Sequence, residues 1–256
     1  MDVIVLAGGT TGIDDLLYDA AKGGYKALID IGGKPMLQWG LDALSGSSKI
    51  GHVVIVGLPE KTNLECKHPL TMIADHGGIV NNIKAGAKEL LKIHPDPEAK
   101  VLALSADVPA ITPEIVDWLI NEVEKTDHDI YYSIIKKDVM EARFPGSKRS
   151  FIHLKDIDVC GGDFNAARLG IAAGGHAFID ELSKQRKNVI KQAYMVGFGT
   201  VFLLLMRQLT LENAIARVCK QLDLTGRAIL NPYAEVGMDV DKPFQLDIMR
   251  KELTGQ

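Results

Sequence analysis

Short runs of aliphatic residues recur along the first half of the chain, and each run is almost continuously apolar. They lie at residues 3–6, 52–56, 71–74, 101–104 and 130–135. A continuous apolar run of this length is typical of a strand covered on both faces, as strands are in a parallel sheet. A similar run at 227–233 predicts one more strand near the end of the chain.

Helical patterns lie between these runs. Apolar residues recur at helical spacing, or a helix-starting proline is present, at residues 35–44, 79–93, 112–123 and 243–253. Pro35, Pro113 and Pro243 can each take the first position of a helix, and Thr112 is a good N-cap. Because strands and helices alternate, the sequence predicts an α/β fold with a doubly wound, mostly parallel sheet.

The regularity weakens from Phe151 onwards. Residues 176–224 have the pattern of several consecutive helices, which predicts a helical insertion or cap within a single domain of residues 1–256. The apolar run at 194–206 is shorter than the ~20 residues that a membrane-spanning helix needs. We expect a buried helix there and no transmembrane segment, with peripheral contact to a lipid or an apolar acceptor as the alternative.

Composition narrows the function classes. Hydrophobic residues make up 46% and charged residues 24%, which excludes a disordered, collagenous or coiled-coil chain. The formal net charge is −4 and the pI is about 6.0, so no basic field favours a nucleic-acid partner. Three widely spaced cysteines without a C-x-x-C pair, and a start without a signal-peptide pattern, predict a cytoplasmic protein with reduced thiols.

Glycines and lysines follow the first strand. The turn after it contains Leu6, Ala7, Gly8, Gly9 and Thr10. Such a turn lets backbone N–H groups approach a ligand and can cradle phosphates, but taken alone it fits an ordinary tight turn equally well. Lys26 and Lys34 flank a short strand and turn further on. A lysine near a glycine turn offers a compact cation to a triphosphate, although a solvated surface charge is the usual fate of lysine.

Carboxylates follow two of the predicted strands. Asp107 comes directly after the apolar run at 101–104, and Asp239 and Asp241 stand between the last strand and the last helix. In open α/β sheets, ligands bind at the carboxyl ends of the strands, and one or two carboxylates there can hold Mg²⁺ together with substrate phosphates. The alternatives are a turn aspartate at 107 and a helix N-cap at 241.

Taken together and in this order, these segments resemble the MobA-like nucleotidyltransferases, which are related to sugar-nucleotide and isoprenoid cytidylyltransferases. The family pattern is LAGG, a lysine, G-K-P-M-L and a strand-end aspartate, here at residues 6–9, 26, 33–37 and 107. The family's C-terminal D-x-D-T-P-E-D-L motif looks like residues 239–246, with Asp241 as the better metal-ligand match and Asp239 as the second. The resemblance covers most of residues 1–135 and 227–253, and it implies a Rossmann-like fold of the GT-A type.

The resemblance also implies a site. The backbone of residues 7–9 and the segment 75–82 would form the base and ribose pocket, including Gly78 and Asn82. An amide presents both a donor and an acceptor to a base, but a helix N-cap is an equally good interpretation of the Asn81-Asn82 pair. Gly8, Gly9 and Lys26 would hold the phosphates. Mg²⁺ would be held by Asp107 and Asp241, with Asp239 as a further ligand.

The loop after LAGG departs from the family pattern, and the middle of the chain matches that pattern less closely. Relatives carry a phosphate-gripping arginine soon after LAGG; here that loop has none, and Lys22 is the substitute we expect. A basic cluster at Arg143, Lys148 and Arg149 falls where the family places its acceptor. It would suit a phosphorylated acceptor, but a solvated charge run is the competing interpretation.

These observations lead to one main hypothesis and two alternatives. The main hypothesis is an Mg²⁺-dependent nucleotidyltransferase, which moves the NMP unit of an NTP to a phosphorylated small-molecule or lipid-linked acceptor and releases pyrophosphate. Asp239-Val240-Asp241 also spells the D-x-D triplet of a GT-A glycosyltransferase. The other alternative is a non-catalytic nucleotide-binding module. The base, the acceptor and the oligomeric state stay open at this stage.

Overall fold

Nine strands form one mixed sheet in the computed structural model, which describes residues 1–175, 203–204 and 206–255. The order is β5-β4-β1-β6-β10-β7-β9-β8. Strands β10 and β9 pair with the same side of β7, one after the other along its length, and β11 pairs with the opposite side. The strands are β1 (Asp2–Leu6), β4 (Val53–Val56), β5 (Leu70–Ile73), β6 (Lys100–Ser105), β7 (Ile130–Lys136), β8 (Ile152–His153), β9 (Asp158–Gly161), β10 (Phe164–Arg168) and β11 (Gly226–Leu230).

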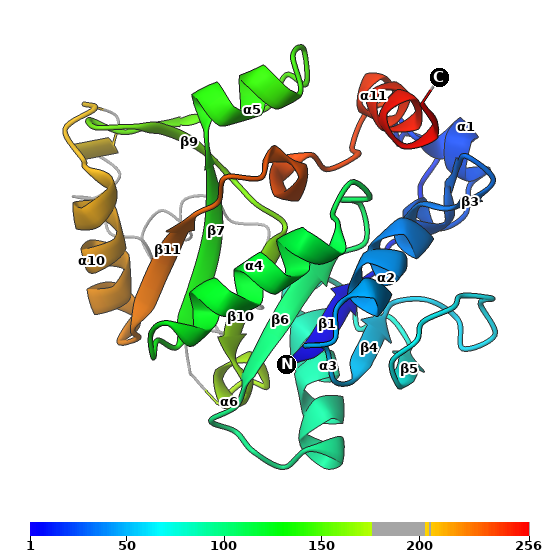
Figure 1. Cartoon of the computed structure of the whole chain (residues 1–256), viewed down its shortest axis with the longest axis horizontal. Helices are drawn as coiled ribbons and strands as arrows, with labels where there is room; N and C mark the ends of the chain where they lie inside the picture. The colour runs from blue at the N-terminus through cyan, green and yellow to red at the C-terminus, as the bar shows by residue number, and fades with distance from the viewer. Residues whose placement is uncertain (176–202, 205, 256) are drawn as a thin grey trace.

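Helices cover both faces of this sheet (Figure 1). On one face lie α2 (Met36–Gly46) and α4 (Pro113–Glu124), and on the other α3 (Ile79–Ile93) and α6 (Leu169–Ala172). The doubly wound α/β fold predicted from the sequence is therefore confirmed. The remaining elements are α1 (Tyr18–Ala21), η1 (Lys26–Leu28), β2 (Asp30–Ile31), β3 (Lys34–Pro35), α5 (Lys137–Arg143), α10 (Leu211–Leu222), η2 (Ala234–Gly237) and α11 (Pro243–Thr254).

The C-terminal half differs from the prediction in part. Strands β8, β9 and β10 form where no strand was expected, and β10 lies antiparallel between β6 and β7. The last strand ends at Leu230, before the predicted end at 233. Helix α10 lies inside the predicted helical segment 176–224, but residues 176–202 and 205 lie outside the described residues. In the described part of the chain, no helix is long and apolar enough to cross a membrane.

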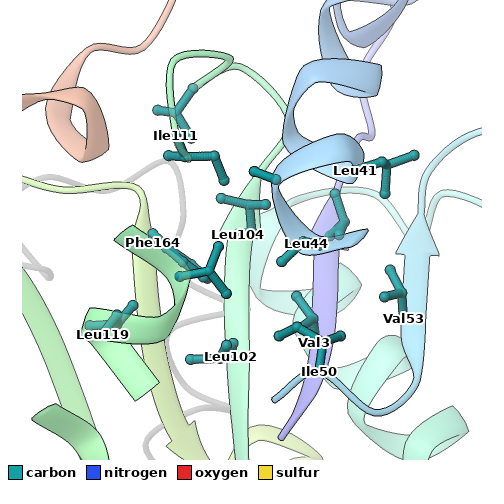
Figure 2. Packing of buried hydrophobic residues seen from close by; sticks show 14 of the residues in the cluster. Val3, Leu41, Leu44, Ile50, Val53, Leu102, Leu104, Ile111, Leu119 and Phe164 are labelled. Atoms are coloured by element: carbon teal, nitrogen blue, oxygen red, sulfur yellow. The ribbon is translucent and has the colours of Figure 1, made fainter. Parts of the chain in front are cut away.

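The largest core cluster lies between the sheet and the helices α2 and α4 (Figure 2). Val3, Leu102 and Leu104 point from β1 and β6 toward Leu44 of α2 and Leu119 of α4, and all are essentially inaccessible to solvent. Burying side chains of this size contributes about 1.5–3 kcal/mol each. This packing fixes the strands whose ends carry the candidate site.

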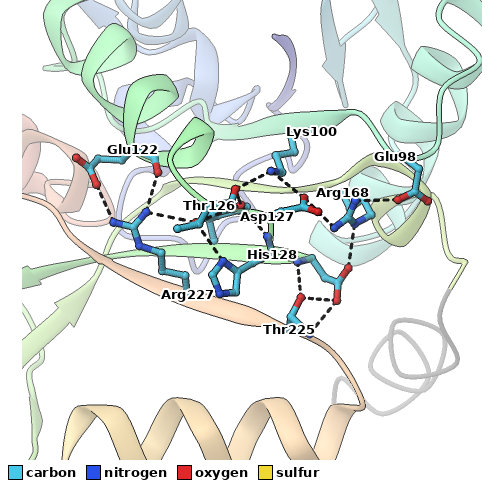
Figure 3. A network of polar contacts seen from close by, with 11 residues as sticks. Glu98, Lys100, Glu122, Thr126, Asp127, His128, Arg168, Thr225 and Arg227 are labelled. Atoms are coloured by element: carbon cyan, nitrogen blue, oxygen red, sulfur yellow. Dashed lines mark hydrogen bonds and ion pairs between the residues drawn. The ribbon is translucent and has the colours of Figure 1, made fainter.

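A polar network holds the opposite end of these strands together (Figure 3). Arg168 at the end of β10 forms ion pairs with Glu98, Asp127 and Asp129. Thr225, just before β11, donates through its hydroxyl to Asp129 at 2.7 Å. The network therefore ties β10 and β11 to the start of β7, at the end of the sheet away from Asp107.

Candidate active site

Four segments that are far apart in the sequence meet at the carboxyl ends of the central strands β1 and β6. This end of the strands is called the C-terminal edge of the sheet. β1 and β6 are parallel with Leu6 opposite Ser105, so the loops that follow them start side by side. The N–H of Ser105 donates to the carbonyl of Asp163 at 2.9 Å, because antiparallel β10 begins at this same edge. The segment after η2 joins them, since the N–H of Val240 donates to the carbonyl of Asp107 at 2.9 Å.

A cavity of about 850 Å³ opens at this edge. Lys26 is the only lysine or arginine among the described residues that line it. Thr10 lies outside the lining and forms an isolated antiparallel bridge with Tyr25. The structure brings eight of the predicted nucleotide-binding residues to the cavity, namely Leu6, Ala7, Gly8, Gly9, Lys26, Gly78, Asn82 and Asp107.

Backbone conformation explains Gly9 and close packing explains Gly8, the two glycines after β1. Gly9 has a φ of +103°, a conformation that only glycine adopts readily. A Cβ on Gly8 would lie 2.6 Å from Nδ2 of Asn82 and 2.8 Å from Oδ1 of Asp75. The turn therefore lies directly against the loop before α3, and both segments form one wall of the cavity.

Asn82 stabilises that wall. The N-cap of α3 is Gly78, so the alternative interpretation of Asn82 as an N-cap is wrong. Its side chain is buried; Nδ2 donates to Asp75 at 2.8 Å, and Oδ1 accepts from the N–H of His76 at 2.8 Å. Both ends of the amide are thus engaged within the loop. The carboxylate that Asn82 holds at the cavity belongs to Asp75.

Lys26 connects the two predicted carboxylates. Its Nζ donates to Oδ2 of Asp107 at 2.6 Å and also to Oδ1 of Asp241. Burial of the ammonium lowers the pKa of Lys26, but the two carboxylates outweigh burial, and the pKa is raised overall. Asp241 is not the N-cap of α11, because Lys242 takes that position.

Asp163 is a third carboxylate at the site, and sequence reasoning did not assign it a role. It lines the cavity beside Asp107. The pKa of its carboxyl is raised to about 6, first by burial and then by the charge of Asp107, with a further increase from Asp241. The pair Gly161-Gly162 before Asp163 was the one available signal, since it resembles the glycine turns at other strand ends.

Asp239 has a different environment from Asp241. It forms an ion pair with Arg149, whereas Asp241 pairs with Lys26. Neither of the two aspartates is among the described residues that line the cavity. The guanidinium of Arg149 also lies 4.0 Å from the carboxylate of Asp163. The structure therefore does not bring Asp239 to Lys26 alongside Asp107 and Asp241.

The other predicted cations lie elsewhere. Arg143 forms ion pairs with Glu235 and Glu252. Lys34 pairs with Asp42 and lies 3.6 Å from the ring centre of Trp39. Neither Lys34 nor Lys22 lines the cavity, and Lys22 is exposed at the end of α1.

The carboxylates at this edge fit a divalent cation. Asp107 and Asp241 both reach the same ammonium, so their oxygens lie no more than two hydrogen-bond lengths apart. Within the described residues, no three His, Cys, Asp or Glu side chains are grouped to hold a metal ion. Mg²⁺ needs no such group, because it is held by one or two carboxylates together with waters and substrate phosphates.

The fold is an open α/β sheet with a cavity at the carboxyl ends of β1 and β6, where proteins of this architecture bind their ligands. Residues 3–222 match the model of the MobA-like NTP transferase domain, so the chain belongs to that family and is an NTP-dependent nucleotidyltransferase. The match favours the nucleotidyltransferase hypothesis over the glycosyltransferase alternative.

Individual relatives agree with the family. A protein of Thermococcus sibiricus, named a probable molybdenum cofactor guanylyltransferase, is 24% identical over 151 residues, which cover 59% of this chain and 70% of the relative. The solved structure of a hypothetical transferase from Thermus thermophilus has a TM-score of 0.81 at 29% identity and covers 96% of this chain and 98% of its own. The molybdopterin-guanine dinucleotide biosynthesis protein A of Archaeoglobus fulgidus shares the fold, with a TM-score of 0.52, 15% identity and complete coverage of both chains.

Proposed function

We propose that the protein transfers the NMP unit of an NTP to a phosphorylated acceptor, with Mg²⁺ as cofactor and pyrophosphate as the second product. The observation that supports this most is the meeting of Lys26, Asp107 and Asp241 beside the turn at Gly8 and Gly9. Lys26, Asp107, Gly8 and Gly9 line the cavity, and Asp241 joins them through its ion pair with Lys26, which supports a site with a cation and two hard oxygen ligands.

Each group has a defined task in this proposal. The backbone of Gly8 and Gly9 and the ammonium of Lys26 bind the triphosphate. Asp107 and Asp241 hold Mg²⁺, which when bound neutralises the charge that develops on the phosphates. An oxygen of the acceptor phosphate attacks the α-phosphorus, the bond from the α-phosphorus to the bridging oxygen breaks, and pyrophosphate leaves with the electron pair. No protein nucleophile is needed, because the acceptor attacks as an existing anion.

We propose GTP as the first nucleotide to test. The relative from Thermococcus sibiricus is named as a guanylyltransferase. Asp75, which Asn82 holds at the cavity, can only accept hydrogen bonds, and guanine offers two adjacent N–H donors on its Watson–Crick edge. A thermal-shift comparison of the four NTPs with Mg²⁺ tests this, because a ligand that binds the folded state raises the melting temperature. A larger shift with another base would contradict the choice of guanine.

Pyrophosphate release tests the reaction itself. Asp107→Asn and Asp241→Asn should each lose activity by at least about a hundredfold, the usual effect of removing a group that stabilises transition-state charge. Asp42→Asn removes the carboxylate that pairs with Lys34, away from the cavity, and should keep full activity. Full turnover by both site variants would refute the proposed metal ligands. Small-molecule and lipid-linked phosphates belong in the same screen, since both satisfy the chemistry of attack.

We also propose a cytoplasmic location. The cysteines Cys66, Cys160 and Cys219 are all free thiols, which supports a reducing compartment. The run at 194–206, considered above for contact with a lipid, falls largely outside the described residues. Binding of the intact protein to vesicles that contain the lipid-linked acceptor candidates tests peripheral contact.

A further inference from the structure

Both carboxylate oxygens of Asp107 already have protein donors. The hydroxyl of Ser105 donates to Oδ1 at 2.6 Å, and the ammonium of Lys26 donates to Oδ2 at 2.6 Å. The same ammonium donates to Oδ1 of Asp241. A single lysine therefore occupies one oxygen of each of the two carboxylates that we assign to the metal.

A divalent cation that bridges these two oxygens competes with the ammonium that already bridges them. Mg²⁺ binds carboxylate oxygens at about 2.0–2.1 Å in a near-octahedral shell. A lysine nitrogen that bridges the same two oxygens lies within a few ångströms of a metal ion bound to them, so the two positive charges repel each other. Binding of the metal to both Asp107 and Asp241 is therefore strongly favoured when Lys26 moves away.

We propose that Lys26 keeps the metal site closed in the free enzyme, and that the triphosphate opens it by drawing the ammonium away, so that the divalent cation binds only together with the nucleotide. This inference rests on the metal ligands of the proposed function. It adds a binding order that the roles of the separate residues do not imply.

The position of Lys26 makes this exchange feasible. Lys26 lines the same cavity as Gly8 and Gly9, and it is the only lysine or arginine in the described part of that lining. A triphosphate in the cavity therefore competes for this ammonium with the two carboxylates, and the flexible four-carbon stem lets the ammonium turn from one partner to the other. By thermodynamic linkage, the factor by which the bound nucleotide raises the affinity for the metal equals the factor by which the bound metal raises the affinity for the nucleotide.

Titration with Mn²⁺ in the absence of nucleotide and acceptor tests the inference, with free Mn²⁺ followed by electron paramagnetic resonance. A hydrogen bond to a charged group is worth roughly a tenfold change in an equilibrium constant or more. We therefore expect Lys26→Met to bind one Mn²⁺ at least about tenfold more tightly than the wild type. Lys26→Gln, which keeps a polar end group on a slightly shorter side chain but not the charge, should shift in the same direction.

Two matched variants control for indirect effects. Lys34→Met removes the neighbouring lysine, whose partners Asp42 and Trp39 lie away from the cavity, and should leave Mn²⁺ affinity at the wild-type value. The double variant Lys26→Met/Asp241→Asn should lose the affinity gained by Lys26→Met, because one of the two ligands is gone.

Two outcomes would overturn the inference. Wild-type protein that binds Mn²⁺ alone as tightly as Lys26→Met would show that the lysine does not exclude the metal. Absence of Mn²⁺ binding by both Lys26 variants would show that removal of the charge does not open a site. Neither result depends on turnover, so the pyrophosphate assay still decides the proposed function independently.

Discussion

Replacing Asp163 with asparagine is expected to stabilise the metal-free protein at neutral pH. Burial, followed by the charge of Asp107, raises the pKa of the folded-state carboxyl from 3.8 to about 6. An acid with a raised folded-state pKa holds its proton more tightly in the folded protein than in the unfolded chain. Its ionisation therefore destabilises the fold, and wild-type stability falls as the pH rises from 3.8 through about 6. Asparagine carries no charge and avoids this loss.

The magnitude follows from the size of the pKa shift. A rise from 3.8 to about 6 corresponds to roughly 3 kcal/mol at about 1.36 kcal/mol per unit. The Asp163 side chain is 37% exposed, so solvent screening reduces this value. We therefore expect Asp163→Asn to gain about 1–2 kcal/mol in free energy of unfolding at pH 7.5 and to lie within ~0.5 kcal/mol of the wild type at pH 4.

Urea denaturation with a metal chelator at both pH values measures the difference. Asp247→Asn serves as the control, since Asp247 is exposed on α11 and its nearest cation, Arg250, lies 4.0 Å away. It should change the unfolding free energy by less than ~0.5 kcal/mol at either pH. If Asp163→Asn were no more stable than the wild type at pH 7.5, then burial and the charge of Asp107 would not raise the pKa of Asp163 in the folded protein.

Three further substitutions probe other parts of the molecule. Gly8→Ala places a Cβ 2.6 Å from Nδ2 of Asn82, so the turn must shift. We expect the affinity for GTP, measured by calorimetry, to fall at least about tenfold. An unchanged affinity would show that the turn does not bind the phosphates. Asn82→Ala deprives Asp75 of a donor, and chemical denaturation should show a loss of about 1–3 kcal/mol, whereas a neutral effect would mean that the loop does not depend on this amide. Arg168→Met breaks the ion pair to Asp129 and should lower stability by about 1–2 kcal/mol without a change in pyrophosphate release; an equal loss of activity would show that the network also shapes the site.

The parallel part of the sheet could be predicted from the sequence because burial on both faces leaves a simple signature. The nearly continuous apolar runs at residues 52–56 and 101–104 predict the strands β4 (Val53–Val56) and β6 (Lys100–Ser105). The helix at 79–93 has the bounds that its periodicity indicates. The turn at Gly8 and the carboxylate of Asp107 could be predicted for the same reason. Once the strands are parallel, their carboxyl ends must share one edge.

Side-chain partners could not be predicted in this way. Lys26 and Lys34 have similar settings in the sequence, yet only Lys26 enters the cavity, whereas Lys34 packs on Trp39. Asp239 and Asp241 are two residues apart, and the chain directs one to Arg149 and the other to Lys26. These outcomes depend on which element packs nearby, and spacing along the chain carries no information about that.

The position of Asp163 has a more general cause. The rule that ligands bind at carboxyl ends of strands assumes that the strands near the site run in the same direction. β10 runs against β6, so the residue before β10, not the residue after it, lies beside Asp107. Its sequence, Phe164–Arg168, is only weakly apolar, which hides the strand and, with it, the change of direction. In a mixed sheet, the residue that precedes an antiparallel strand is therefore as strong a candidate for the active site as the residue that follows a parallel one.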